Sequence, residues 1–175
     1  RGDPLTSSVS PRRTTEVLIV LTILVISMGG MIRIYDAGES CPDWPTCFGT
    51  WGFDISEEEQ GEWWEENPDE ADSRGSGHRY SSFQIFTEWF HRLLAGAFVG
   101  PLVVLNWLLV RKETWTSPRV KGVSSLALGL ILWQGAIGWL TVKMDNENWS
   151  VAIHLGSAMA FLISLIWLWM EIRRD

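Results

Sequence analysis

Four long apolar runs are the feature that most constrains what this chain can fold into. They lie at residues 17–34, 83–110, 120–142 and 149–170. A helix needs about 20 apolar residues to cross the hydrocarbon core of a bilayer. Lipid offers the backbone no hydrogen-bond partner, so a spanning segment must satisfy its own polar groups as a helix. The runs therefore predict an all-α membrane protein, an up-down four-helix transmembrane bundle over residues 17–175 in a lipid bilayer.

The first run has a second interpretation, because Arg12 and Arg13 precede it as they would precede a secretory signal. No small-residue cleavage site follows the run, and Arg33 stands at its end. A retained membrane helix is therefore favoured over a removed signal.

Charge predicts the orientation of the bundle. Basic residues flank the runs at Arg12, Arg13, Arg111, Lys112, Arg119, Lys121, Arg173 and Arg174. The loop 35–82 between the first two runs instead contains 13 of the 21 acidic residues. By the positive-inside rule, both termini, including the segment 1–16, lie in the cytoplasm of a prokaryotic cell whose plasma membrane the chain crosses several times. The acidic loop then faces outside, and no nucleic-acid partner is predicted.

Part of this outer loop carries a dense acidic stretch at 57–72 that shows no packing pattern. Such a composition predicts a solvated, mobile insertion. The loop histidine, His78, is likewise expected to be solvated.

Three of the ionisable side chains inside the apolar runs are a glutamate and two histidines. Glu88 and His91 lie three residues apart in the second run, on one face of a helix, and His154 lies in the fourth run. At 1.5 Å per residue from the outer ends of the runs, Glu88 lies about 8 Å deep, His91 about 12 Å and His154 about 8 Å. Ionisable groups are costly at such depths, so each is a candidate functional residue.

Two neutral imidazoles at similar depth are suitable axial ligands for a haem iron. From the residues alone, the alternative that each histidine bonds a neighbouring helix stays open. A di-iron carboxylate site is set aside, because it needs a second Glu-x-x-His and further glutamates, and the runs contain no carboxylate besides Glu88. Arg92 and Arg33 could each pair with a haem propionate or bond backbone carbonyls as structural residues. Gln134 is expected to join helices rather than to act as a ligand.

The two cysteines, Cys41 and Cys47, lie in the loop that is predicted to face outside. A disulfide is expected in that oxidising compartment. It could be structural or redox-active. A zinc site is less favoured, because two thiols without nearby histidines make a poor set of ligands.

Three stretches together resemble the haem A synthase family (CtaA). They are GGMIRIYDAGESCPDWPTCFG at 29–49, TEWFHRLLAG at 87–96 and QGAIGWLTVKMDNENWSVAIHLGSAM at 134–159. Members of this family oxidise the C8 methyl of haem O to a formyl group, giving the haem A of terminal oxidases. The resemblance implies that Glu88 is catalytic, that His91 and His154 hold a haem, either haem b or the substrate haem O, and that Cys41 and Cys47 form a disulfide.

The family typically has eight helices in two similar halves, whereas this chain contains one half. It is therefore expected to be a fragment, or a half-size form that pairs as a homodimer or with a second four-helix half. Haem O synthase or a thiol–disulfide reductant are further expected partners. Two alternatives remain at this point: a bis-histidine b-type cytochrome that only transfers electrons, and an assembly subunit without haem.

Overall fold

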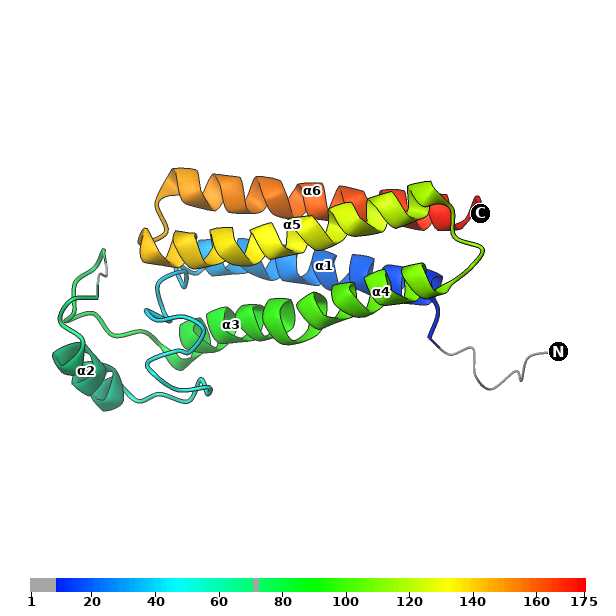
Figure 1. Cartoon of the computed structure of the whole chain (residues 1–175). Helices are drawn as coiled ribbons and strands as arrows, with labels where there is room; N and C mark the ends of the chain where they lie inside the picture. Colours follow the sequence, from blue (N-terminus) through cyan, green and yellow to red (C-terminus); the bar gives the residue numbers. More distant parts are fainter. Residues whose placement is uncertain (1–8, 71–72) are drawn as a thin grey trace.

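The structure of the protein is a computed structural model that describes residues 9–70 and 73–175. Its helices are α1 Pro11–Ile34, α2 Glu57–Glu66, α3 Ser82–Leu93, the π-helix η1 Leu94–Val99, α4 Gly100–Lys112, α5 Pro118–Lys143 and α6 Asn148–Ile172 (Figure 1). Within the described ranges, four helical spans are long and apolar enough to cross a membrane, with α3, η1 and α4 forming one of them. The predicted all-α, four-helix membrane bundle is confirmed.

The first span begins at Pro11, before the apolar run itself. Ser10 caps it, because the Ser10 side chain accepts a hydrogen bond from the Arg13 amide at 3.3 Å. Pro11 occupies the first turn, where a missing N–H costs nothing. The segment 1–16, predicted to be cytoplasmic, thus contains the start of α1, and its residues 1–8 lie outside the described part of the chain.

The second span changes its helical form in the middle. Pro101 cannot donate a hydrogen bond to Ala97, and its ring would collide with the Ala97 carbonyl in a regular α-helix. The π-helix Leu94–Val99 contains this carbonyl and widens the turn around it. Such π segments often lie beside functional sites. Here the π-helix rotates α3, which carries Glu88 and His91, relative to α4 around the axis of the span.

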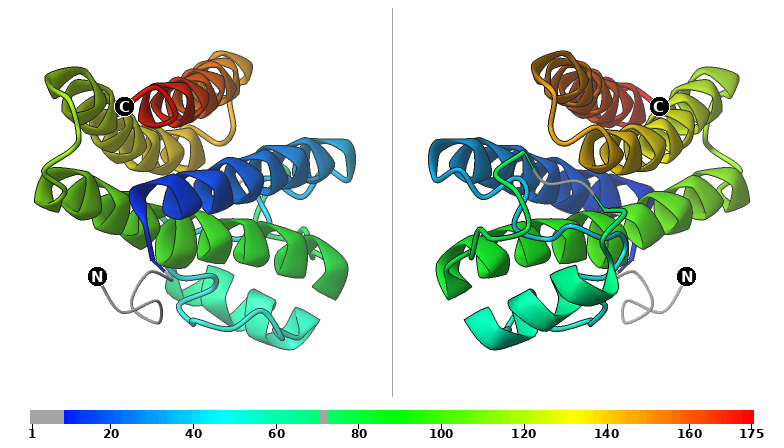
Figure 2. Two further views of the ribbon diagram at one scale, coloured as in Figure 1. Left: turned by 90° about the vertical axis from the view of Figure 1, so that its right-hand side faces the viewer. Right: turned by 90° about the vertical axis from the view of Figure 1, so that its left-hand side faces the viewer.

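The other three spans do not contribute equally to the packing around α1. Helix α1 packs against α3, α4 and α6, while α5 packs against α4 and α6. An apolar core in the middle of the bundle joins Leu18, Val99, Val103, Ala127, Phe161 and Leu165. Towards the outer end, α3 lies on one side of α1 and the α5–α6 pair lies on the other (Figure 2).

The outer loop is folded, and the prediction of a solvated, mobile stretch at 57–72 was wrong for residues 57–66. Helix α2 begins with a capping box, in which Ser56 and Glu59 exchange hydrogen bonds with each other's backbone. Its inner face buries Gln60 and Trp64, which are 1% and 5% exposed. Residues 71–72 of that stretch lie outside the described residues.

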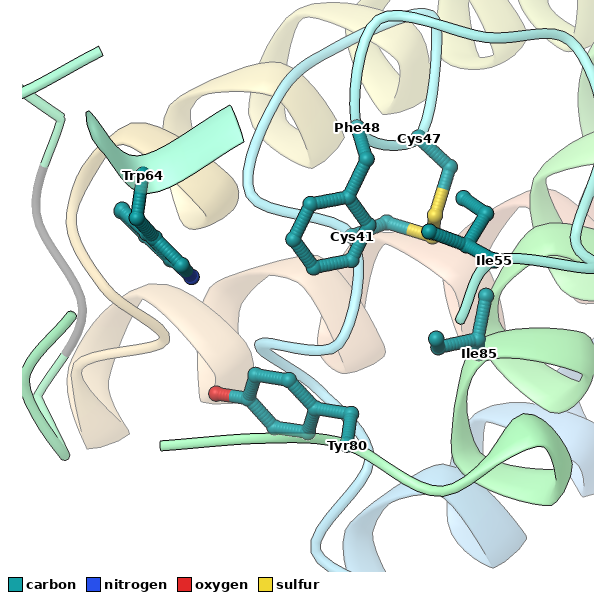
Figure 3. Close-up of a cluster of buried hydrophobic side chains, with 7 residues drawn as sticks. All are labelled: Cys41, Cys47, Phe48, Ile55, Trp64, Tyr80 and Ile85. Atoms are coloured by element: carbon teal, nitrogen blue, oxygen red, sulfur yellow. A yellow bond between two sulfur atoms is a disulfide. The ribbon is translucent and has the colours of Figure 1, made fainter. Parts of the chain in front are cut away.

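Trp64 belongs to a second hydrophobic core, formed by the outer loop and the start of α3 (Figure 3). It contains Cys41, Cys47, Phe48, Ile55, Trp64, Tyr80 and Ile85. The Gln60 side chain makes two hydrogen bonds to the backbone of Tyr80. The Gln60 amide nitrogen donates to the Tyr80 carbonyl at 3.0 Å, and the Gln60 side-chain oxygen accepts from the Tyr80 amide at 2.8 Å. The expectation that His78 is solvated was also wrong, since its half-buried ring packs edge-on against Tyr80, with 4.7 Å between the ring centroids.

Candidate functional site

The two histidines of the spans each pack against a glycine of a neighbouring helix. A Cβ added at Gly29 of α1 would lie 3.5 Å from Cε1 of His91, and one added at Gly138 of α5 would lie 3.2 Å from Cε1 of His154. The second distance is shorter than ordinary van der Waals contact, so glycine is needed at 138 for the present ring position. The two imidazoles are half-buried and lie within electrostatic range of each other.

Both rings keep a buried nitrogen without a partner. Nδ1 of His91 and Nδ1 of His154 have no hydrogen bond among the described residues, although His91 also reaches the backbone of Val25. Leaving a buried polar atom unpaired costs about 1–3 kcal/mol, so such atoms usually indicate an additional group. Neutral imidazoles in a region of low dielectric constant are a donor set that suits a haem iron. The residues present therefore fit a haem.

The predicted catalytic carboxylate, Glu88, is buried against the outer loop and is 5% exposed. Its Oε2 accepts hydrogen bonds from the Ser40 hydroxyl at 3.0 Å and from the Cys41 amide at 2.9 Å. Its Oε1 accepts from Nη2 of Arg92 at 2.5 Å. Charge-assisted bonds of this kind hold a carboxylate firmly in one orientation.

Arg92 joins this carboxylate to the outer loop. Besides Glu88, its guanidinium donates to the carbonyls of Cys41 at 2.7 Å, Asp43 at 2.5 Å and Thr46 at 3.0 Å. The sequence left two roles open for Arg92, pairing with a haem propionate or bonding backbone carbonyls. The contacts in the structure are those of the second role. Pairing with a haem propionate stays a prediction.

Arg33 lies at the outer end of α1, where its Nη2 donates to Oδ1 of Asn148 at 2.6 Å. This contact ties α1 to the start of α6, and a bond to a propionate again stays a prediction. Gln134 joins helices as expected, because its amide nitrogen donates to the His154 carbonyl at 2.9 Å and its oxygen accepts from the Ser157 hydroxyl. It thereby fixes the helical turn that carries His154.

The predicted disulfide is confirmed between Cys41 and Cys47, and both residues are almost completely buried. The backbone of Cys41 touches both members of the buried ion pair, since its amide bonds Glu88 and its carbonyl bonds Arg92. The disulfide loop therefore sits directly on the candidate catalytic carboxylate. Sequence reasoning did not single out Ser40 in this role, although it stands immediately before Cys41.

The depth of the site can also be counted in residues from the opposite ends of the spans. This count gives a shallower position than the count from the ends of the apolar runs that are predicted to face outside. The ends that are predicted to face the cytoplasm are marked by Arg13, Arg111, Lys121 and Arg173. About 20 residues outward from these markers reach Arg33, His91, Thr141 and Ile153. By this count we expect both histidines at the boundary of the hydrocarbon core that is predicted to face outside. Glu88 lies about one turn outside it, because α3 begins well before the boundary.

The fold and the site define a multi-pass membrane protein with two half-buried imidazoles and a hydrogen-bonded carboxylate towards the end of the bundle that carries the long loop. The family model COX15-CtaA, described as cytochrome oxidase assembly protein, matches residues 12–175, and the chain belongs to this family. The family predicted from the sequence is confirmed.

Individual relatives agree with the family model. The chain is 32% identical over 158 residues to a heme A synthase of Shewanella oneidensis, which covers 90% of the chain and 44% of that protein. It is 30% identical over 189 residues to a heme A synthase of Maricaulis maris, covering 97% of the chain and 53% of the relative. A heme A synthase–mitochondrial ferredoxin fusion protein of Schizosaccharomyces pombe is 29% identical over 84% of the chain and 26% of its own length.

The chain thus spans about half the length of the bacterial relatives. No solved structure matches it. These relatives are named heme A synthases, so the comparisons do not support the alternative of a b-type cytochrome that only transfers electrons.

Proposed function

We propose that this chain is the haem-binding, catalytic half of a haem A synthase, a membrane oxidoreductase that oxidises the C8 methyl of haem O to a formyl group. One observation carries the proposal: His91 and His154 keep unpaired buried nitrogens, and His91 follows the fully hydrogen-bonded carboxylate of Glu88 by three residues, in a member of the COX15-CtaA family. The product would serve terminal oxidases, in keeping with the family's role in cytochrome oxidase assembly.

His91 and His154 would hold the haem, whose iron supplies redox chemistry when bound. We take haem O to be the substrate, and haem b is the other pigment that this pair of histidines could accept. Gly29 and Gly138 would contribute by letting the imidazoles pack closely against α1 and α5. Gln134 would keep His154 in position through its carbonyl.

Glu88 would stabilise positive charge that develops on the reacting methyl carbon, or accept a proton from an attacking water. To do either, one carboxylate oxygen must become available. Ser40 can release Oε2, because its hydroxyl also lies 2.8 Å from the Ala37 carbonyl and 3.0 Å from the Gln84 carbonyl. A rotation of one hydroxyl proton would then free a lone pair of Glu88 while Arg92 and the Cys41 amide keep the carboxylate in place.

The site would open to the outer face of a prokaryotic plasma membrane, with both termini in the cytoplasm. The missing half would be supplied by a second copy of this chain or by another four-helix half. The fusion of a relative to a mitochondrial ferredoxin supports a ferredoxin-type electron donor as a partner. Haem O synthase and a thiol–disulfide reductant acting on Cys41 and Cys47 are the other partners that we propose.

The test is to express the chain in a bacterium that makes haem O but lacks its own haem A synthase. We expect pigment extracts to contain a formyl haem. We expect Glu88→Gln to keep bound haem while haem O or a hydroxylated intermediate accumulates. Glu58→Gln, on the exposed face of α2, is the matched control and leaves the product unchanged. Unaltered haem A output from Glu88→Gln would remove the catalytic role, and haem b alone in every extract would overturn the proposed reaction.

A further inference from the structure

One short segment of the outer loop, Trp51–Phe53, turns its aromatic side chains away from the loop core. Trp51 is 74% exposed and Phe53 is 36% exposed. By contrast, Phe48, Trp64 and Tyr80 of the same loop are buried in its core. Exposed aromatic rings that adjoin one another on a surface often mark a binding site for lipid or protein.

This segment is attached to the side of α3. The indole nitrogen of Trp89 donates to the Trp51 carbonyl at 2.8 Å. The Phe53 ring packs against Phe86 and Trp89, with centroid distances of 5.0 and 4.9 Å. Phe90 continues the row, stacked on Phe86 at 5.5 Å. The loop therefore follows an aromatic ridge of a membrane-spanning helix instead of projecting into water.

The position of Trp89 sets the depth of the segment. The outer boundary of the hydrocarbon core crosses this span near His91, by the count of about 20 residues from the inner basic residues. Trp89 lies two residues further out, which is about 3 Å at 1.5 Å per residue. Because the Trp51 carbonyl bonds the Trp89 indole, the backbone of Trp51 lies in the headgroup region of the outer leaflet.

Other exposed aromatic residues lie within about 6 Å of the same boundary on the remaining spans, by the same count at 1.5 Å per residue. Tyr35, Trp139 and Trp149 are each about half exposed, at 51%, 46% and 49%. They stand near the outer ends of α1, α5 and α6. Tryptophan and tyrosine favour this interface, where the ring is apolar and its N–H or O–H stays wet. Trp51 therefore fills a place in an aromatic belt, although it comes from a loop.

Charge separates this segment from the rest of the loop. Residues 48–53 contain no charged side chain, within a loop that holds 13 acidic residues. The segment is also held close to the disulfide, because the Cys47 amide donates to the Thr50 carbonyl at 2.9 Å and the Thr50 amide donates back at 3.1 Å. A neutral aromatic turn on a short tether can enter the headgroup region without carrying carboxylates with it.

We propose that Trp51–Phe53 is a membrane anchor that inserts into the interfacial region of the outer leaflet and contacts phospholipid. The anchor fixes the disulfide loop at the bilayer surface, directly above Glu88. This inference stands independently of the reaction proposed above, because it depends on the position of the segment on α3 and not on any bound pigment.

The test places a nitroxide spin label at Trp51→Cys in nanodiscs of phosphatidylcholine, with Cys41 and Cys47 left oxidised. Relaxation by dissolved oxygen, which partitions into lipid, is compared with relaxation by a water-soluble nickel complex. Glu58→Cys on the exposed face of α2 is the control. We expect oxygen to dominate at position 51 and the nickel complex to dominate at position 58, so that the accessibility ratio reverses between the two sites.

A ratio at 51 that equals the ratio at 58 would place the segment in water and overturn the proposal. Low accessibility to both reagents would also overturn it, because protein from a second copy or another half would then cover the segment. Should Trp51→Cys fail to fold, Gly52→Cys keeps both aromatic rings. A Cβ at Gly52 meets only the Thr50 hydroxyl, at 3.9 Å, so this second variant reports the same depth without strain.

Discussion

The buried pair of Glu88 and Arg92 allows a quantitative test of the geometry around the disulfide loop. Arg92→Gln would remove the cation that faces Glu88 and the donors to the carbonyls of Cys41, Asp43 and Thr46. The two side chains are 6% and 13% exposed, so solvent cannot replace the lost bonds easily. Breaking a buried pair by removing one partner typically costs about 3–5 kcal/mol. We expect a loss of that order in the free energy of unfolding.

The chain supplies a matched control at the other end of the bundle. Arg12 and Glu16 form an ion pair with the same spacing of four residues, but their side chains are 57% and 43% exposed. Solvent screens an exposed pair of this kind, so Arg12→Gln should change stability little. Unfolding by sodium dodecyl sulfate titration in mixed micelles measures both variants.

A double variant makes the test sharper. In a Glu88→Gln background there is no buried carboxylate for Arg92 to neutralise, so Arg92→Gln should cost less than it does in the unaltered chain. Equal costs in the two backgrounds would refute the argument, because they would show that Glu88 and Arg92 do not interact across the loop. Equal costs for Arg92→Gln and Arg12→Gln would refute it as well.

Three further outcomes follow from the structure. Trp64→Ala should destabilise the outer loop by about 3–5 kcal/mol, the usual effect of removing a buried tryptophan, and should raise amide exchange in α2 without unfolding the spans. Gly138→Ala should displace His154 by a few tenths of an ångström and reduce haem retention, read from the Soret absorbance of the purified chain. The pKa of Glu59 is held below its ordinary value by hydrogen bonds from the Ser56 backbone and side chain. The capping of α2 should therefore persist above that ordinary value and be lost as the pH falls through the lowered one, which exchange at α2 amides would show.

The membrane spans could be predicted from the sequence because length and hydropathy determine them directly. The site could be predicted only in part. Glu88, His91 and His154 stand out as ionisable residues in apolar runs, and the motif around Cys41 led to the family. Nothing in the runs indicated that the Glu88 carboxylate would accept a hydrogen bond from the Cys41 amide of a distant loop, because a backbone partner carries no side-chain signal.

Helix α2 shows why the outer loop was misread. Only Gln60 and Trp64 of this helix are buried, and glutamates occupy most of its other positions. Two inward residues one turn apart give no periodic pattern that composition can reveal. The loop core that receives them is assembled from separate segments around the disulfide, including Ile55 and Tyr80. Helix α2 therefore forms because of tertiary packing against this core, although its acidic composition alone favours disorder.

The central claim is that His91 and His154 hold a haem that becomes the substrate of an oxidation at Glu88. Mass spectrometry of the porphyrin that co-purifies with the chain tests this claim most directly. We expect haem O together with its formyl product, and the loss of both from His91→Ala and His154→Ala. A chain that purifies with no porphyrin, or with haem b alone, would contradict it.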